Sequence, residues 1–165
     1  MKTLYLIRHA KSSWKDLSLE DIERPLNKRG KKDAPLIGQY LKKKGATPDL
    51  LISSPAKRAY TTAKLVAKEL DYDVADIVKD KKIYVFDYSG KDVMEVVRNI
   101  KNKHDVVMIF GHNPTFSHLS NSFTDKQIEE MPTCGTVCFQ FDTDKWKEIE
   151  DSEAELIFSI HPKML

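Results

Sequence analysis

The feature that most constrains this chain is the regular alternation of short apolar runs with longer amphipathic stretches. The apolar runs are compact enough to be buried strands: Thr3–Ile7, Asp49–Ile52 and Asp105–Phe110. Apolar residues at helical spacing predict these helices: 29–44, Pro55–Leu70, Asp92–Ile100 and one from about Pro114. Further strands are expected at Val74–Val78, Thr136–Phe141 and Ala154–Ile160. We therefore predict an α/β fold, a three-layer αβα sandwich whose mostly parallel central sheet has helices on both faces.

Length and composition indicate one globular domain over residues 1–165, because no repeat or linker divides the chain. No apolar stretch approaches the roughly 20 residues of a transmembrane helix, and the first apolar run is too short for a signal peptide. We expect a cytoplasmic monomer that binds no membrane. The net charge is +2, and no basic run is interleaved with aromatic residues as in nucleic-acid-binding proteins.

Metal ligands are sparse in the sequence. A metal-dependent hydrolase would need close-spaced ligand pairs or carboxylate clusters, which we do not find. Cys134 and Cys138 stand four residues apart beside Gly135, and we expect both to be buried free thiols. We therefore expect neither a metal nor another cofactor.

Charged and polar residues follow three of the predicted strands, at the point where each strand ends. Arg8 and His9 end the first, Ser54 and then Arg58 follow the second, and His112 follows the strongest. Ligands of parallel α/β sheets bind just beyond the carboxyl ends of the strands. We therefore expect two histidines and two arginines to meet at one edge of the sheet.

These four residues suit phosphoryl transfer without a metal. Arg8 and Arg58 supply rigid, permanently charged forks that match phosphate oxygens. A neutral His9 can act as the nucleophile, and His112, held cationic by the phosphate, can donate to an equatorial oxygen. Each pair is weak evidence alone, but the joint arrangement at three strand ends predicts a phosphatase site.

Four neighbouring residues are candidates for substrate binding: Lys11, Ser12, Ser54 and Asn113. Lys11 and Ser12 follow His9, and either a contact with substrate or a role in folding the loop fits them. Ser54 can also cap the helix that follows it. Trp14 either lines the mouth of the pocket or packs the loop.

The sequence resembles the histidine phosphatase superfamily, which has the phosphoglycerate mutase-like fold. Leu6–Ala10 is similar to its Arg-His-Gly motif, with Ala10 in place of the usual Gly. Three further segments resemble its later motifs: Ser53–Ala63, Gly111–Pro114 and the loop Pro25–Gly30. The run Arg8–Trp14 looks closest to the small SixA-type phosphohistidine phosphatases. The resemblance implies that His9 is phosphorylated, that Arg8, Arg58 and His112 hold the phosphoryl group, and that no metal is used.

One departure from the family concerns the general acid. Larger members carry a Glu or Asp after the second motif, and the matching region here is Ile83–Gly90. Asp87 is the best candidate, although a loop carboxylate that caps the next helix fits it equally well. Because an alcohol leaving group needs protonation, the missing acid favours phosphohistidine or another labile phosphoryl group over sugar phosphates.

Two classes of function remain open at this point. The first is an enzyme that removes phosphoryl groups from a phosphorylated protein, with a small phosphorylated molecule as the alternative substrate. The second is a module that recognises phosphate and turns nothing over. The intact His9 favours the enzyme, because binding alone does not need a nucleophile.

Overall fold

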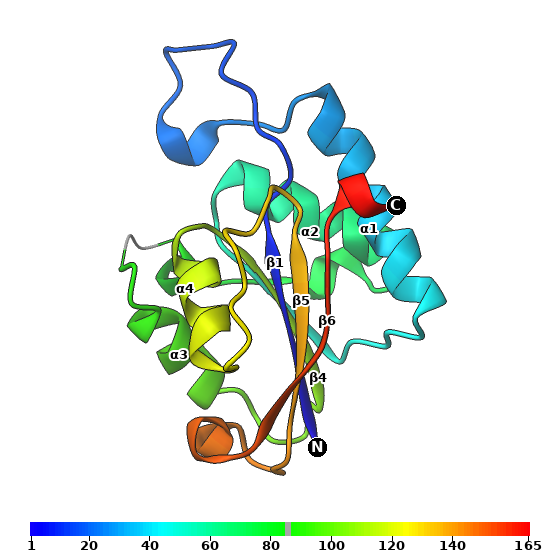
Figure 1. Cartoon of the computed structure of the whole chain (residues 1–165). Helices are drawn as coiled ribbons and strands as arrows, with labels where there is room; N and C mark the ends of the chain where they lie inside the picture. The colour runs from blue at the N-terminus through cyan, green and yellow to red at the C-terminus, as the bar shows by residue number, and fades with distance from the viewer. Residues whose placement is uncertain (85–86) are drawn as a thin grey trace.

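One central sheet organises the protein (Figure 1). The computed structural model describes residues 1–84 and 87–165, and within them six strands lie in the order β3-β2-β4-β1-β5-β6. Their bounds are β1 Lys2–Arg8, β2 Leu50–Ser53, β3 Val78–Lys79, β4 Val106–Gly111, β5 Thr136–Phe141 and β6 Ala154–Ile160. The first four pair in parallel, whereas β5 runs antiparallel to both β1 and β6.

Helices cover both faces of the sheet. They are α1 Lys28–Lys43, α2 Lys57–Glu69, α3 Lys91–Arg98 and α4 Thr115–Ser122, with 3-10 turns η1 Asp21–Glu23, η2 Val74–Asp76, η3 Lys81–Ile83, η4 Trp146–Asp151 and η5 Pro162–Met164. Tyr5 and Ile7 of β1 share a core with α1 and α2, whereas Leu4 and Leu6 share one with α3, α4 and η4. Successive residues of a strand point to opposite faces, so both faces of β1 are buried. The predicted three-layer α/β sandwich is confirmed.

Local signals set the ends of the helices close to where the sequence predicts them. The Oδ1 of Asn27 accepts a hydrogen bond from the backbone N–H of Gly30 at 2.9 Å and caps the start of α1. Gly45 follows the end of that helix with a φ of 79°, a conformation that glycine adopts without steric cost. The helix expected from Pro55 begins at Lys57 instead.

One predicted element is wrong. The segment expected as a strand at Val74–Val78 is mostly the 3-10 turn η2, and β3 retains only Val78–Lys79. The side chain of Asp73 accepts a hydrogen bond from the N–H of Ala75 at 2.9 Å, which stabilises a turn where a ladder would otherwise form. Among the described residues, no helix is long and apolar enough to cross a membrane.

Candidate active site

The predicted site forms at the carboxyl ends of three adjacent strands, β2, β4 and β1 (Figure 1). Arg8 pairs with Gly111 in the register of β1 and β4. The backbone N–H of His9 donates to the oxygen of Gly111 at 3.0 Å, and that of Ser54 donates to Phe110 at 2.9 Å. These bonds carry the strand register into the loops, so the loops start from fixed positions at one edge of the sheet.

His9 is buried, and a backbone carbonyl fixes its ring tautomer. Its Nδ1 lies 2.7 Å from the carbonyl oxygen of Ala10. A carbonyl can only accept, so Nδ1 carries the proton and Nε2 keeps its lone pair. Burial lowers the pKa of His9 to about 3, and the positive charges of Arg58 and Arg8 act in the same direction. At neutral pH the ring is therefore uncharged.

His112 faces His9 across the site. The centroids of the two rings are 5.4 Å apart, and the Nε2 of His112 lies 2.7 Å from the Oγ of Ser54. Burial lowers the pKa of His112 to about 3, with smaller contributions from His9 and Arg58. Ser54, predicted to bind substrate, thus contacts the catalytic candidate His112, and its Oγ also accepts from the N–H of Ala56 at 3.1 Å.

The two arginines are held by different parts of the chain. Arg58 is buried in the first turn of α2, and its Nη1 and Nη2 donate to the backbone oxygen and carboxylate of Asp21 at 2.7 and 3.0 Å. The Nη1 of Arg8 donates to the carbonyl of Met131 at 2.8 Å. Its buried Nε has no hydrogen-bond partner among the described residues. Burial lowers the pKa of Arg8, with the charge of Arg58 acting in the same direction.

Sequence reasoning missed the group that organises Arg58. The carboxylate of Asp21 accepts from Arg58, from Arg24 at 3.1 Å and from the Tyr84 hydroxyl at 2.7 Å. Burial would raise the pKa of Asp21, but the bonds from Tyr84 and Arg58 outweigh it and lower the pKa to about 2. The Tyr84 ring also packs edge-on against His112 at 5.5 Å. The available sequence signal for this group of contacts was Arg24, which directly precedes the loop Pro25–Gly30.

Thr62 ties the loop after β1 to α2. Its hydroxyl donates to the carbonyl of Arg58 at 2.7 Å and accepts from the N–H of Ala10 at 3.0 Å. The N–H of Cys134 donates to the carbonyl of His9 at 3.0 Å. His9 and Ala10 are thereby held through main-chain groups as well as through the side chain of His9.

The remaining substrate-binding candidates lie around this centre with different surroundings. Ser12 is buried, and its Oγ accepts from the Nη2 of Arg24. The side chain of Lys11 is exposed. Asn113 is engaged by its own loop, since its Oδ1 accepts from Ser117 and its Nδ2 donates to Met131 at 2.9 Å. Contact of any of the three with substrate stays a prediction.

The structure places Asp87 in a turn. Its Oδ1 accepts from the Oγ of Ser89 at 2.7 Å and from the N–H of Ser89 at 3.1 Å, and these bonds lower its pKa. The Oγ of Ser89 in turn accepts from the N–H of Lys91 at the start of α3. These contacts favour the capping interpretation of Asp87 over that of the acid. Val85 and Phe86, in the segment where the acid was sought, lie outside the described residues.

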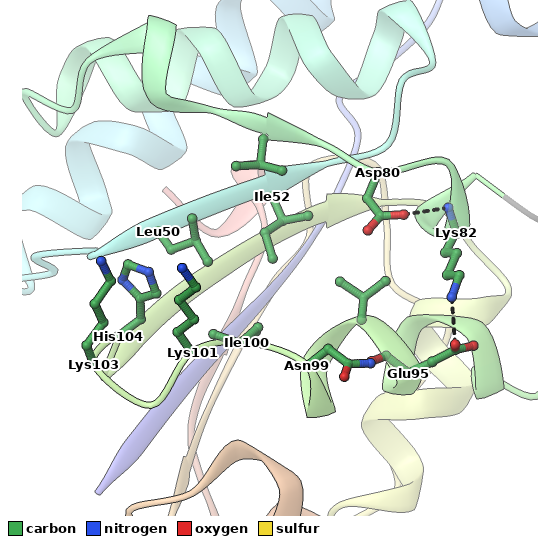
Figure 2. Close-up of a pocket in the computed structure, with 12 residues that line it drawn as sticks. Leu50, Ile52, Asp80, Lys82, Glu95, Asn99, Ile100, Lys101, Lys103 and His104 are labelled. Carbon is green, nitrogen blue, oxygen red and sulfur yellow. Dashed lines mark hydrogen bonds and ion pairs between the residues drawn. The ribbon is translucent and has the colours of Figure 1, made fainter.

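Other features of the described chain lie apart from this centre. Within residues 1–84 and 87–165, no group of three or more His, Cys, Asp or Glu residues could hold a metal ion. Cys134 and Cys138 are buried free thiols. A cavity of about 430 Å³ lies between β2, β3 and α3 (Figure 2). The described residues that line it include Leu50, Ile52 and Lys101 and none of the predicted site residues.

Comparison with known proteins gives one family and a consistent fold. Residues 4–88 match the histidine phosphatase superfamily (branch 1). An uncharacterised chloroplastic protein of Arabidopsis thaliana is 31% identical over 153 residues, which span 89% of this chain and 70% of that protein. A SixA structure from Agrobacterium tumefaciens superposes with a TM-score of 0.81 at 23% identity, and the protein histidine phosphatase SixA complexed with tungstate with 0.79 at 16%. Each likeness covers 98% of both chains.

Proposed function

Because this chain belongs to the histidine phosphatase superfamily (branch 1), we propose that it hydrolyses phosphohistidine in a protein through a covalent phospho-His9 intermediate. One observation carries the proposal. The Ala10 carbonyl fixes the proton of His9 on Nδ1, so Nε2 keeps its lone pair in a ring that the charges of Arg58 and Arg8 help to hold neutral. A ring that served only to bind phosphate would be expected to present an N–H donor there.

The first step transfers the phosphoryl group to His9. The lone pair of Nε2 attacks phosphorus while the bond between phosphorus and the substrate nitrogen breaks, and that nitrogen keeps the electron pair. Arg8 and Arg58 bind the phosphoryl oxygens, whose charge their fixed positive charges stabilise. The arriving dianion raises the pKa of His112, which then donates a hydrogen bond to one of those oxygens.

The second step returns the enzyme to its starting state. Water attacks phosphorus, the bond to Nε2 breaks with its electron pair returning to Nε2, and inorganic phosphate leaves. Throughout, Nδ1 keeps its proton and donates a hydrogen bond to the carbonyl of Ala10. The phosphorylated ring is therefore an imidazolium. When its bond to phosphorus breaks, the group that leaves is neutral imidazole, which is a much better leaving group than imidazolate.

The choice of phosphohistidine follows from the same chemistry. An imidazole leaving group carries a second ring nitrogen that takes a proton directly from solvent, so it needs no acid within the site. An alcohol leaving group would need one. The carboxylate of Asp87 is bound to Ser89 and that of Asp21 to Arg58, and both have lowered pKa values. Neither is suited to give up a proton at neutral pH.

A rapid-quench experiment tests the intermediate. The protein is mixed with a 32P-labelled phosphohistidine protein, quenched, and the label on the enzyme is examined for stability in acid and in alkali. We expect an acid-labile, alkali-stable label that is absent from His9→Ala and present in His118→Ala, which removes an exposed histidine. An acid-stable label, or substantial turnover by His9→Ala, would refute the mechanism.

A further inference from the structure

The loop between β1 and α1 carries the most exposed apolar side chain among the described residues. Leu17 is 84% exposed and Trp14, three residues earlier, is 65% exposed. Figure 1 shows this segment extending past the carboxyl edge of the sheet, beyond the helices. A leucine this exposed adds almost nothing to folding, and exposed apolar groups gathered at one place are typical of interaction sites.

The base of this loop is anchored to its surroundings. Ser12 and Leu26 form an antiparallel bridge, and the N–H of Ser13 donates to Pro25 at 2.8 Å. Buried Arg24 donates to the carbonyl of Ser13 at 3.3 Å. The base of the loop is therefore ordered before any partner binds, which lowers the entropy cost of association.

The same loop is connected to the phosphoryl site at two points along its length. It leaves the site at His9 and returns at Asp21, which holds Arg58. In between, the guanidinium of Arg24 stacks on the ring of Trp14, 3.3 Å from its centroid, and bonds to Asp21. Trp14 is thereby linked through Arg24 to the residue that holds Arg58, and exposed Leu17 lies three residues further along the same loop.

We infer that Leu17 and Trp14 form a docking rim that contacts the apolar surface around the phosphohistidine of a folded protein substrate. The inference rests on the proposed function. A small phosphorylated molecule bound among His9, Arg58 and His112 would have no atoms to spare for a side chain that is 84% exposed on the loop beyond the site. A folded protein presents the residues around its phosphohistidine to the rim at the same time as the phosphoryl group enters the site.

The test compares three substrates: an aryl phosphate, a short phosphohistidine peptide and a histidine-containing phosphocarrier protein phosphorylated with phosphoramidate. Leu17→Ser should leave kcat/KM for the aryl phosphate and the peptide unchanged. Its kcat/KM for the protein should fall about tenfold, mainly through KM, because one buried apolar side chain is lost from the contact. Leu17→Met, which stays apolar, should retain most of the activity on the protein.

The matched control is Ile157→Ser, which removes a 41% exposed apolar side chain from β6 and should change nothing. Equal loss of all three activities in Leu17→Ser would refute the rim and indicate a structural role. Unchanged turnover of the phosphorylated protein by Leu17→Ser would also refute the rim. A wild-type dimer in sedimentation that Leu17→Ser dissociates would refute it as well. If the wild type acts on the aryl phosphate but on neither phosphohistidine substrate, the proposed function fails instead.

Discussion

Replacing Asp21 by Asn tests how much the carboxylate that binds Arg58 contributes to the folding free energy. The carboxylate binds Arg58, Arg24 and the Tyr84 hydroxyl, and its pKa is lowered to about 2, against about 3.9 in an unfolded chain. A gap of that size corresponds to at most about 2.6 kcal/mol of folding free energy at neutral pH. Because 44% of the Asp21 side chain is exposed, solvent screening reduces the expected contribution to about 1 kcal/mol.

The direction in which the stability difference changes with pH decides whether the Asp21 carboxylate is responsible for it. The folded pKa lies below the unfolded one, so the stabilisation is fully present above about pH 4 and is lost as the pH falls toward 2. Urea unfolding should therefore show Asp21→Asn less stable than wild type by about 1 kcal/mol at pH 7, and by about half that at pH 3. Glu20→Gln, which removes the exposed neighbouring carboxylate, should show no such difference. An equal deficit of Asp21→Asn at both pH values would refute the reasoning.

Three further predictions concern the site. Thr62→Val leaves the N–H of Ala10 without its acceptor and should lower stability by about 1–3 kcal/mol in urea unfolding. Thr62→Ser keeps the hydroxyl and should lose less, and equal losses would point to packing. Activity should survive dialysis against EDTA, because Arg8 and Arg58 supply the positive charge, and a loss that a divalent ion restores would contradict this. Crystals soaked in tungstate should show the anion among Arg8, His9, Arg58 and His112, and an anion bound elsewhere would contradict the site.

Most of the strands, and the meeting of Arg8, His9 and His112 at one edge of the sheet, could be predicted from sequence because regular geometry positions them. Thr136–Phe141 and Ala154–Ile160 are strands with the predicted bounds, and the apolar side chains of the first are almost all buried. Arg8 is the last residue of β1, and His9 and His112 directly follow β1 and β4, which pair in parallel. Once the strand order is right, those residues must share one edge of the sheet.

The residues that sequence reasoning missed come from irregular segments. Asp21 lies in the short turn η1 and Tyr84 follows η3, and the two segments meet over Arg58 and His112. No periodicity links positions 21, 58 and 84, because each loop is placed by its own side-chain contacts. Val74–Val78 was mispredicted for the same reason, since the side chain of Asp73 decides its conformation locally.

The position of β1 in the sheet has a consequence for how the protein loses activity on heating. β1 lies between β4 and β5, while the outermost strands are β3 and β6. Fraying begins at sheet edges and exposed ends, whereas strands buried in the centre exchange their amide hydrogens only on global unfolding. His9 follows directly from this central strand, so fraying of the edge strands leaves its main-chain position intact. Heating that first opens the segments around Asp21 and Tyr84 should therefore weaken the hold on Arg58 before it displaces His9.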